Sequence, residues 1–233
     1  MSAIQRFVRG RNVSGLPTVT AAIERAMVVH DKLADEHSTL AADLQLSDLG
    51  KKSKIGKVVL ANVHEVIRIR AAAAKAKDAL AKRAAALQPP PIDRTDVAGA
   101  VLRGQFRDRI AKMSPAEQRA FLPTADPAFW SAVLEAPALC GTGGETLNII
   151  HNLAIEHAHP GALARLQHDR DAVQLLDTAA TVLAEYACEI ADLQSVGILD
   201  EIIAVTVPDT RHLDAEAERS MAPLANYNPE GTQ

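Results

Sequence analysis

One stretch settles the architecture: residues 19–44 read VTAAIERAMVVHDKLADEHSTLAADL. Its apolar positions follow one another in alternating steps of four and three residues, the heptad spacing of helices that pack along their whole length. We expect one helix about 40 Å long, because an α-helix rises about 1.5 Å per residue. The expected packing seam comprises Val19, Ile23, Ala26, His30, Leu33, His37, Leu40 and Leu44.

Two histidines, His30 and His37, occupy this seam seven residues apart and would share one face of the helix. Polar residues at seam positions usually specify helix register or the choice of partner. A second interpretation is a pH-dependent contact, because imidazole becomes charged below about pH 6. A third is that the true seam runs through other residues.

A second long helix is expected over residues 57–87, after a polar connection at 45–56. It ends before three consecutive prolines, Pro89 to Pro91, which lack N–H donors. Its second half is rich in alanine, which favours helix formation and lets a neighbouring helix approach closely. The simplest geometry is an antiparallel, coiled-coil-like hairpin of the two long helices.

Shorter helices are expected beyond the prolines. Residues 114–117 form a capping box, and Asp126-Pro127 begins another helix. A further long helix is expected from about Pro160 to Leu193. Its own heptad seam comprises Val173, Leu176, Ala180, Leu183, Ala187 and Ile190.

Residues 198–207 have the only clear strand propensity, and the end of the chain is expected to be extended. We therefore predict an all-α fold in four parts. These are a basic N-terminal arm at 1–17, the long helical hairpin at 18–88, a bundle of shorter helices with one long helix at 89–195, and an extended C-terminal tail at 196–233.

Composition agrees with this fold. Hydrophobic residues make up 48% of the 233 residues, so the chain can bury a core, whereas aromatic residues make up only 3%. No apolar run approaches the roughly 18 residues of a membrane-spanning helix, so we expect no membrane partner. Cys140 and Cys188 form no recognised redox or zinc motif and are expected to be buried as small hydrophobic residues.

Patterns typical of catalysis or cofactor binding are absent from the sequence. The glycine-rich stretch at 141–144 lacks the lysine of a phosphate-binding Walker loop. Four histidines, His151, His157, His159 and His168, lack the spacing of helical metal ligands. No Ser–His or Cys–His arrangement indicates a nucleophile. We expect no catalytic residue, metal, cofactor or small-molecule substrate.

Charge is distributed unevenly along the chain, although the formal net charge is only −4. Residues 1–88 hold 15 Lys and Arg against 8 Asp and Glu, whereas residues 145–233 hold 4 against 15. This asymmetry indicates either that the basic end meets nucleic acid or another acidic surface, or that opposite ends of two copies meet. A merely solvated helix face is the third interpretation. The candidate contact residues are Lys51, Lys52, Lys54, Lys57, Arg68, Arg70, Lys75, Lys77, Lys82 and Arg83.

Three segments between residues 113 and 166 carry a family resemblance: SPAEQRAFL at 114–122, FWSAVLEAP at 129–137 and HAHPGALARL at 157–166. Together they resemble small helical proteins, mostly uncharacterised, that are encoded in tailed bacteriophages and prophages of proteobacteria. The resemblance covers about a quarter of the chain, and such proteins carry no catalytic residues to transfer.

The resemblance and the charge pattern together predict a non-enzymatic phage structural or assembly protein, associated with the head, neck or tail of the virion. Its partners would be further copies of the chain or other virion proteins, and it would reside in the host cytoplasm during assembly. The alternative is a DNA-binding or packaging-related protein that uses the basic hairpin. Such a protein would bind with a steep dependence on salt.

Overall fold

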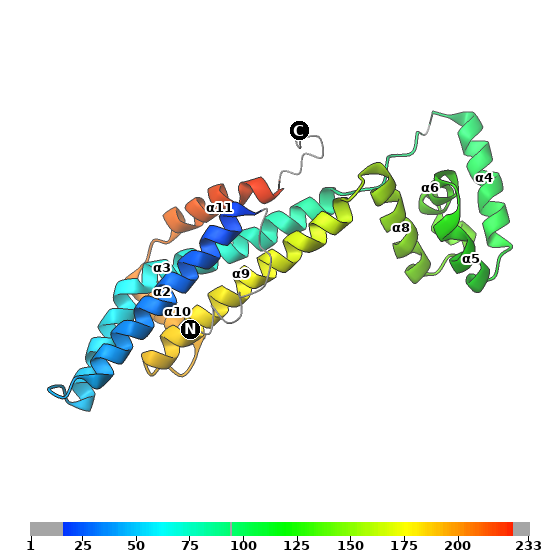
Figure 1. Cartoon of the computed structure of the whole chain (residues 1–233). Coiled ribbons are helices and arrows are strands. Elements are labelled where there is room, and N and C mark those ends of the chain that lie inside the picture. The colour runs from blue at the N-terminus through cyan, green and yellow to red at the C-terminus, as the bar shows by residue number, and fades with distance from the viewer. Residues whose placement is uncertain (1–15, 94, 226–233) are drawn as a thin grey trace. The chain divides into compact units, whose positions relative to one another are not determined.

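The computed structural model describes residues 16–93 and 95–225 (Figure 1). Every element in these ranges is helical and none is a strand, so the all-α prediction is confirmed. Most of the expected basic arm lies outside the described residues, as does the end of the tail. Within the described ranges, no helix combines the length and the apolar character needed to cross a bilayer.

The chain forms two compact units. Residues 16–83 and 168–225 make up what we call the long-helix unit, and residues 84–167 make up the short-helix unit. The long-helix unit is built from α2 (Pro17–Ala42), α3 (Asp48–Ala86), α9 (Ala162–Ile190), α10 (Val196–Thr206) and α11 (Arg211–Ala225).

Helices α2 and α3 run antiparallel. Arg25 of α2 is paired with Glu65 of α3, and Lys32 donates to Asn62 at 3.0 Å. Nearer the turn, the Lys51 ammonium donates to the carbonyl of Ala41 at 2.7 Å. The sequence separation between paired residues therefore decreases toward the turn, as it does in a hairpin of two antiparallel helices.

Most of the expected α2 seam is buried. His37 and Leu40 are only half-buried, and Leu44 is 98% exposed. The prediction for Leu44 was wrong because α2 ends at Ala42, so the heptad register stops before this residue. The buried seam residues are Val19, Ile23, Ala26, His30 and Leu33.

Helix α3 begins nine residues earlier than the sequence pattern predicted, at Asp48 rather than Lys57. The Ser47 hydroxyl accepts a hydrogen bond from the Gly50 amide at 3.2 Å, as an N-cap side chain does. Asp48 places a negative charge in the first turn, where the helix dipole favours it. The expected polar connection therefore shrinks to a short turn.

The prediction of an extended tail was also wrong, because residues 196–206 and 211–225 are helices α10 and α11. In α10, Leu199 and Ile203 are buried four residues apart, so the buried residues follow a helical period. In α11 the buried face is Leu213, Ala217, Met221 and Leu224, and the helix contacts α2.

The predicted boundaries of the 89–195 domain were wrong as well, since α9 from residue 168 onward belongs with α2 and α3. Ion pairs join α3 and α9: Lys77 of α3 pairs with Asp177 of α9 at 2.6 Å, and Arg83 pairs with Asp169. Ala73 and Ala76 of α3 are buried. The entire α9 seam predicted from the sequence is buried: Val173, Leu176, Ala180, Leu183, Ala187 and Ile190.

The short-helix unit contains α4 (Val97–Ala111), α5 (Pro115–Phe121), the 3₁₀ turn η1 (Leu122–Thr124), α6 (Pro127–Glu135), α7 (Pro137–Cys140) and α8 (Gly144–Ala158). The predicted capping box is present, with the Ser114 hydroxyl bound to the Glu117 amide. Asp126 caps α6 by accepting from the Ala128 amide at 2.8 Å. The core includes Ile110, Leu122, Phe129, Trp130, Val133 and Ile150.

Gln118 ties three segments of this unit together from a buried position. Its Nε2 donates to the carbonyls of Ile110 at 3.1 Å and of Cys140 at 3.0 Å. We expect Gln118→Met to lower the free energy of unfolding by about 1–3 kcal/mol, because a thioether cannot satisfy these carbonyls. Urea denaturation followed by circular dichroism measures the loss. Arg119→Met, on the exposed side of α5, is the matched control and should leave the midpoint unchanged.

Both cysteines are buried, as predicted, with Cys140 1% and Cys188 5% exposed. Burial raises the pKa of each thiol above its usual value, so little reactive thiolate forms at pH 8. We expect Ellman's reagent to label the folded chain slowly. In 8 M urea both cysteines should react and release two equivalents of thionitrobenzoate per chain. Rapid labelling of two thiols in the folded chain would contradict this placement.

Candidate functional site

The acidic C-terminal third of the chain pairs with the basic helix α3 inside the long-helix unit. Six of the ten candidate contact residues bind carboxylates from residues 169–218, at sequence separations of up to 148 residues. The described residues of the long-helix unit hold 15 Lys and Arg against 20 Asp and Glu. The basic charge of α3 is therefore largely compensated within this unit. The pairs are Lys52–Asp192, Arg68–Glu216, Arg70–Asp200, Lys75–Glu218, Lys77–Asp177 and Arg83–Asp169.

A chain of ion pairs links α2, α3 and α11. Glu65 binds both Arg25 and Arg68, and Arg68 in turn binds Glu216 at 3.1 Å. Burial raises the pKa of Glu65, but the hydrogen bonds from Arg25 and Arg68 outweigh it and hold the pKa below its usual value. Glu65 therefore stays ionised, and the network holds α11 across the hairpin.

Arg83 and Asp169 form the most deeply buried of these pairs. Their side chains are 8% and 11% exposed, and an Arg83 Nη1 donates to Asp169 Oδ2. His168 lies beside the pair, with its Nδ1 3.5 Å from the other Asp169 oxygen. A buried pair of this kind is weak support for stability as such, but losing one partner strands a charge in the interior.

Four candidate contact lysines remain outside these pairs. Lys54, Lys57 and Lys82 are exposed and make no ion pair within the described part of the chain, and Lys51 binds only the Ala41 carbonyl. Lys54 and Lys57 lie in the first turns of α3. Three of these four lysines therefore lie near the α2–α3 turn, and Lys82 lies near the other end of α3.

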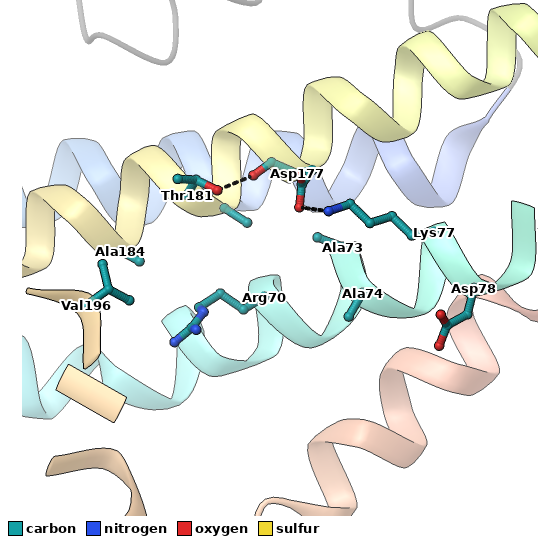
Figure 2. Close-up of a pocket in the computed structure, with 10 residues that line it drawn as sticks. Arg70, Ala73, Ala74, Lys77, Asp78, Asp177, Thr181, Ala184 and Val196 are labelled. Atoms are coloured by element: carbon teal, nitrogen blue, oxygen red, sulfur yellow. Dashed lines mark hydrogen bonds and ion pairs between the residues drawn. The ribbon is translucent and has the colours of Figure 1, made fainter. Parts of the chain in front are cut away.

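A groove with a cavity of about 370 Å³ lies between α3 and α9 (Figure 2). Its walls include the small side chains of Ala73, Ala74 and Ala184. Lys77 reaches Asp177 across it at 2.6 Å. Arg70, Asp78 and Thr181 also line the groove, so it combines methyl groups with charged and hydroxyl groups.

A second cavity of about 220 Å³ lies between α2, α3 and α11. Ile69, Ala72 and Met221 give it an apolar lining, and Arg25 and Arg68 of the ion-pair chain stand at its border. Because α11 forms one wall and is held by ion pairs, this cavity belongs to the packing of the long-helix unit itself.

Apolar side chains are exposed at the α2–α3 turn, which we call the leucine tip and define as Leu44, Leu46 and Leu49. Leu44 is 98% and Leu49 79% exposed, and Leu46 is half-buried. Lys54 and Lys57 follow Leu49 within about 12 Å of helical rise. The leucine tip thus combines exposed aliphatic surface with unpaired positive charge.

A second apolar surface lies on α10, which we call the α10 face and define as Ile198, Ile202 and Val205. Seven of the eleven α10 residues are apolar, yet only Leu199 and Ile203 are buried. Val205 is 82% exposed, and Ile198 and Ile202 are half-buried. Helical spacing of three and four residues places the exposed Glu201 on this same face.

The histidines form no site in the described residues. His30 is buried with its ring 4.5 Å from that of Tyr186, so it packs α2 against α9. Among the described residues no group of three or more His, Cys, Asp or Glu side chains could hold a metal ion.

Sequence reasoning identified the charged residues but not their mutual pairing, which depends on α9–α11 folding back onto α3. The sequence does contain a signal for this pairing, because α3 is basic and the last third of the chain is acidic. Opposite charges of this kind favour contact between the two segments within one chain. The α10 face was missed because its β-branched residues indicated a strand.

The comparisons with known proteins give no family for this arrangement of helices. No protein-family model matches the chain, and it matches no curated protein and no solved structure.

Proposed function

We propose that this chain is a non-enzymatic structural or assembly protein of a tailed phage, associated with the head, neck or tail of the virion. The observation that carries the proposal is the exposure of aliphatic side chains at the leucine tip and on the α10 face. Clustered apolar surface of this kind is typical of protein–protein contact sites. The sequence resemblance to phage proteins supplies the biological context.

The arrangement of the long-helix unit supports the same proposal. Ion pairs join α3 to α9, α10 and α11. The leucine tip and the α10 face therefore belong to one compact unit.

Mass spectrometry of purified particles from the encoding phage or prophage tests this function. We expect the chain at a reproducible copy number per particle, and at the same copy number after particles are washed in high salt. Particles that contain no copies, in a lysate that contains the free chain, would overturn the assignment to the virion.

The alternative is a nucleic-acid-binding protein, and Lys54 and Lys57 are the observation that favours it. Six of the ten candidate basic residues already bind carboxylates, which leaves few charges for phosphate groups. A mobility-shift assay with duplex DNA at low salt separates the two functions. A shift that Lys54→Glu and Lys57→Glu abolish would support the alternative.

A further inference from the structure

We infer that the leucine tip of one copy docks on the α10 face of a second copy. The inference rests on the proposed assembly function and names the two surfaces that it would use. Both surfaces belong to the long-helix unit, and both expose aliphatic side chains to solvent.

The two surfaces are complementary in charge. Near the leucine tip, Lys51, Lys54 and Lys57 make no ion pair within the described residues, and they outnumber the two carboxylates there, Asp43 and Asp48. On the α10 face, Glu201 is exposed and makes no ion pair within the same ranges.

Complementary charge also explains why the second copy fits better than a lipid surface. The α10 face needs a partner that is both apolar and basic, and the leucine tip needs one that is both apolar and acidic. A contact between copies satisfies both surfaces at once, whereas an anionic bilayer would satisfy only the tip.

The contact joins two different surfaces, so it is heterologous. One docked pair leaves a free leucine tip on one copy and a free α10 face on the other, and further copies can add to these ends. An eleven-residue helix and a turn bury less area than a standard interface of about 800 Å² per partner. We therefore expect weak association that grows steadily with concentration.

The first experiment is sedimentation velocity on the full chain over a concentration series from about 1 to 500 μM. The wild-type chain should form a ladder of increasing oligomers. Leu44→Ser/Leu49→Ser and Ile202→Ser/Val205→Ser should each remain monomeric, with unchanged circular dichroism. Val97→Ser/Val101→Ser, also exposed but on α4 of the short-helix unit, is the matched control and should assemble like the wild type.

The decisive experiment mixes the two monomeric variants. The tip variant keeps its α10 face and the α10 variant keeps its tip, so an equimolar mixture should form one-to-one dimers and nothing larger. Two variants that stay monomeric when mixed would overturn the inference, even if each behaves as expected alone.

Charge reversal tests the pairing of the surfaces directly. Lys54→Glu and Glu201→Lys should each weaken association at least fivefold, and the double variant should recover most of the loss. Oligomers that persist in the leucine-tip variant would show that the chain assembles through other surfaces, which would overturn this inference and leave the proposed function standing.

A lipid partner is the remaining outcome to distinguish. Flotation with phosphatidylcholine vesicles, with and without 30% phosphatidylglycerol, tests whether the chain binds lipid. A wild-type chain that stays monomeric at 500 μM and floats with the anionic vesicles through Leu44 and Leu49 would overturn docking between copies.

Discussion

An Arg83→Met chain is expected to lose about 3–5 kcal/mol of its free energy of unfolding. The Asp169 carboxylate is 11% exposed and would be left in the interior without its guanidinium partner. The penalty comes from the stranded charge rather than from the lost attraction, because burying both charges already cancels much of their mutual stabilisation. Urea denaturation monitored by circular dichroism at 222 nm measures the change.

The double variant Arg83→Met/Asp169→Leu separates these two causes. If the stranded carboxylate is responsible, removing it should restore most of the lost stability, since apolar residues of similar volume often replace buried pairs without cost. Lys52→Ala is the matched control, because the Lys52–Asp192 pair is exposed and should leave the denaturation midpoint unchanged. A single variant as stable as the wild type would show that the pair is hydrated in solution.

Replacement of one buried side chain in the core of the short-helix unit should destabilise that unit and leave the long-helix unit folded. Ile110 is fully buried, so Ile110→Ala is expected to cost about 2–5 kcal/mol in the unit to which it belongs. Because the chain forms two compact units, we expect urea to produce an early transition that the wild type lacks. Near-ultraviolet circular dichroism detects that transition, because Trp130 lies in the same core.

The reciprocal variant is Leu183→Ala, at a fully buried position of α9 in the long-helix unit. This variant should lower the stability of the long-helix unit by a similar amount. The near-ultraviolet signal of Trp130 should then change at a higher urea concentration than the signals of the long-helix unit. The histidine–tyrosine contact between α2 and α9 gives a second probe, the fluorescence of Tyr186. A single transition, coincident for all probes in both variants, would contradict independent unfolding of the two units.

Much of the fold could be predicted from local chemistry. The α2 and α9 seams, the capping box at Ser114 and the burial of both cysteines all depend on residues close together in sequence. Helical periodicity and capping act over at most a few turns, so the sequence alone reveals them.

The parts that could not be predicted depend on tertiary contacts. Helix α10 has β-branched residues that favour a strand, and only the burial of Leu199 and Ile203 against the bundle selects the helix. The domain boundary near residue 168 was missed because the α9 seam fits many helical partners equally well. The sequence also predicted too large a free basic surface on α3. Its carboxylate partners are 86 to 148 residues away in sequence, so local patterns do not reveal the pairing.

These long separations have a consequence for synthesis on the ribosome. Helix α3 is complete well before Asp169 and Glu216 are translated, so the nascent hairpin carries its positive charge without the carboxylates that later neutralise it. Contacts this distant in sequence also form slowly during folding. A chain truncated after residue 88 would therefore keep 15 Lys and Arg against 8 Asp and Glu, and only the last third of the protein supplies the carboxylates that pair with α3.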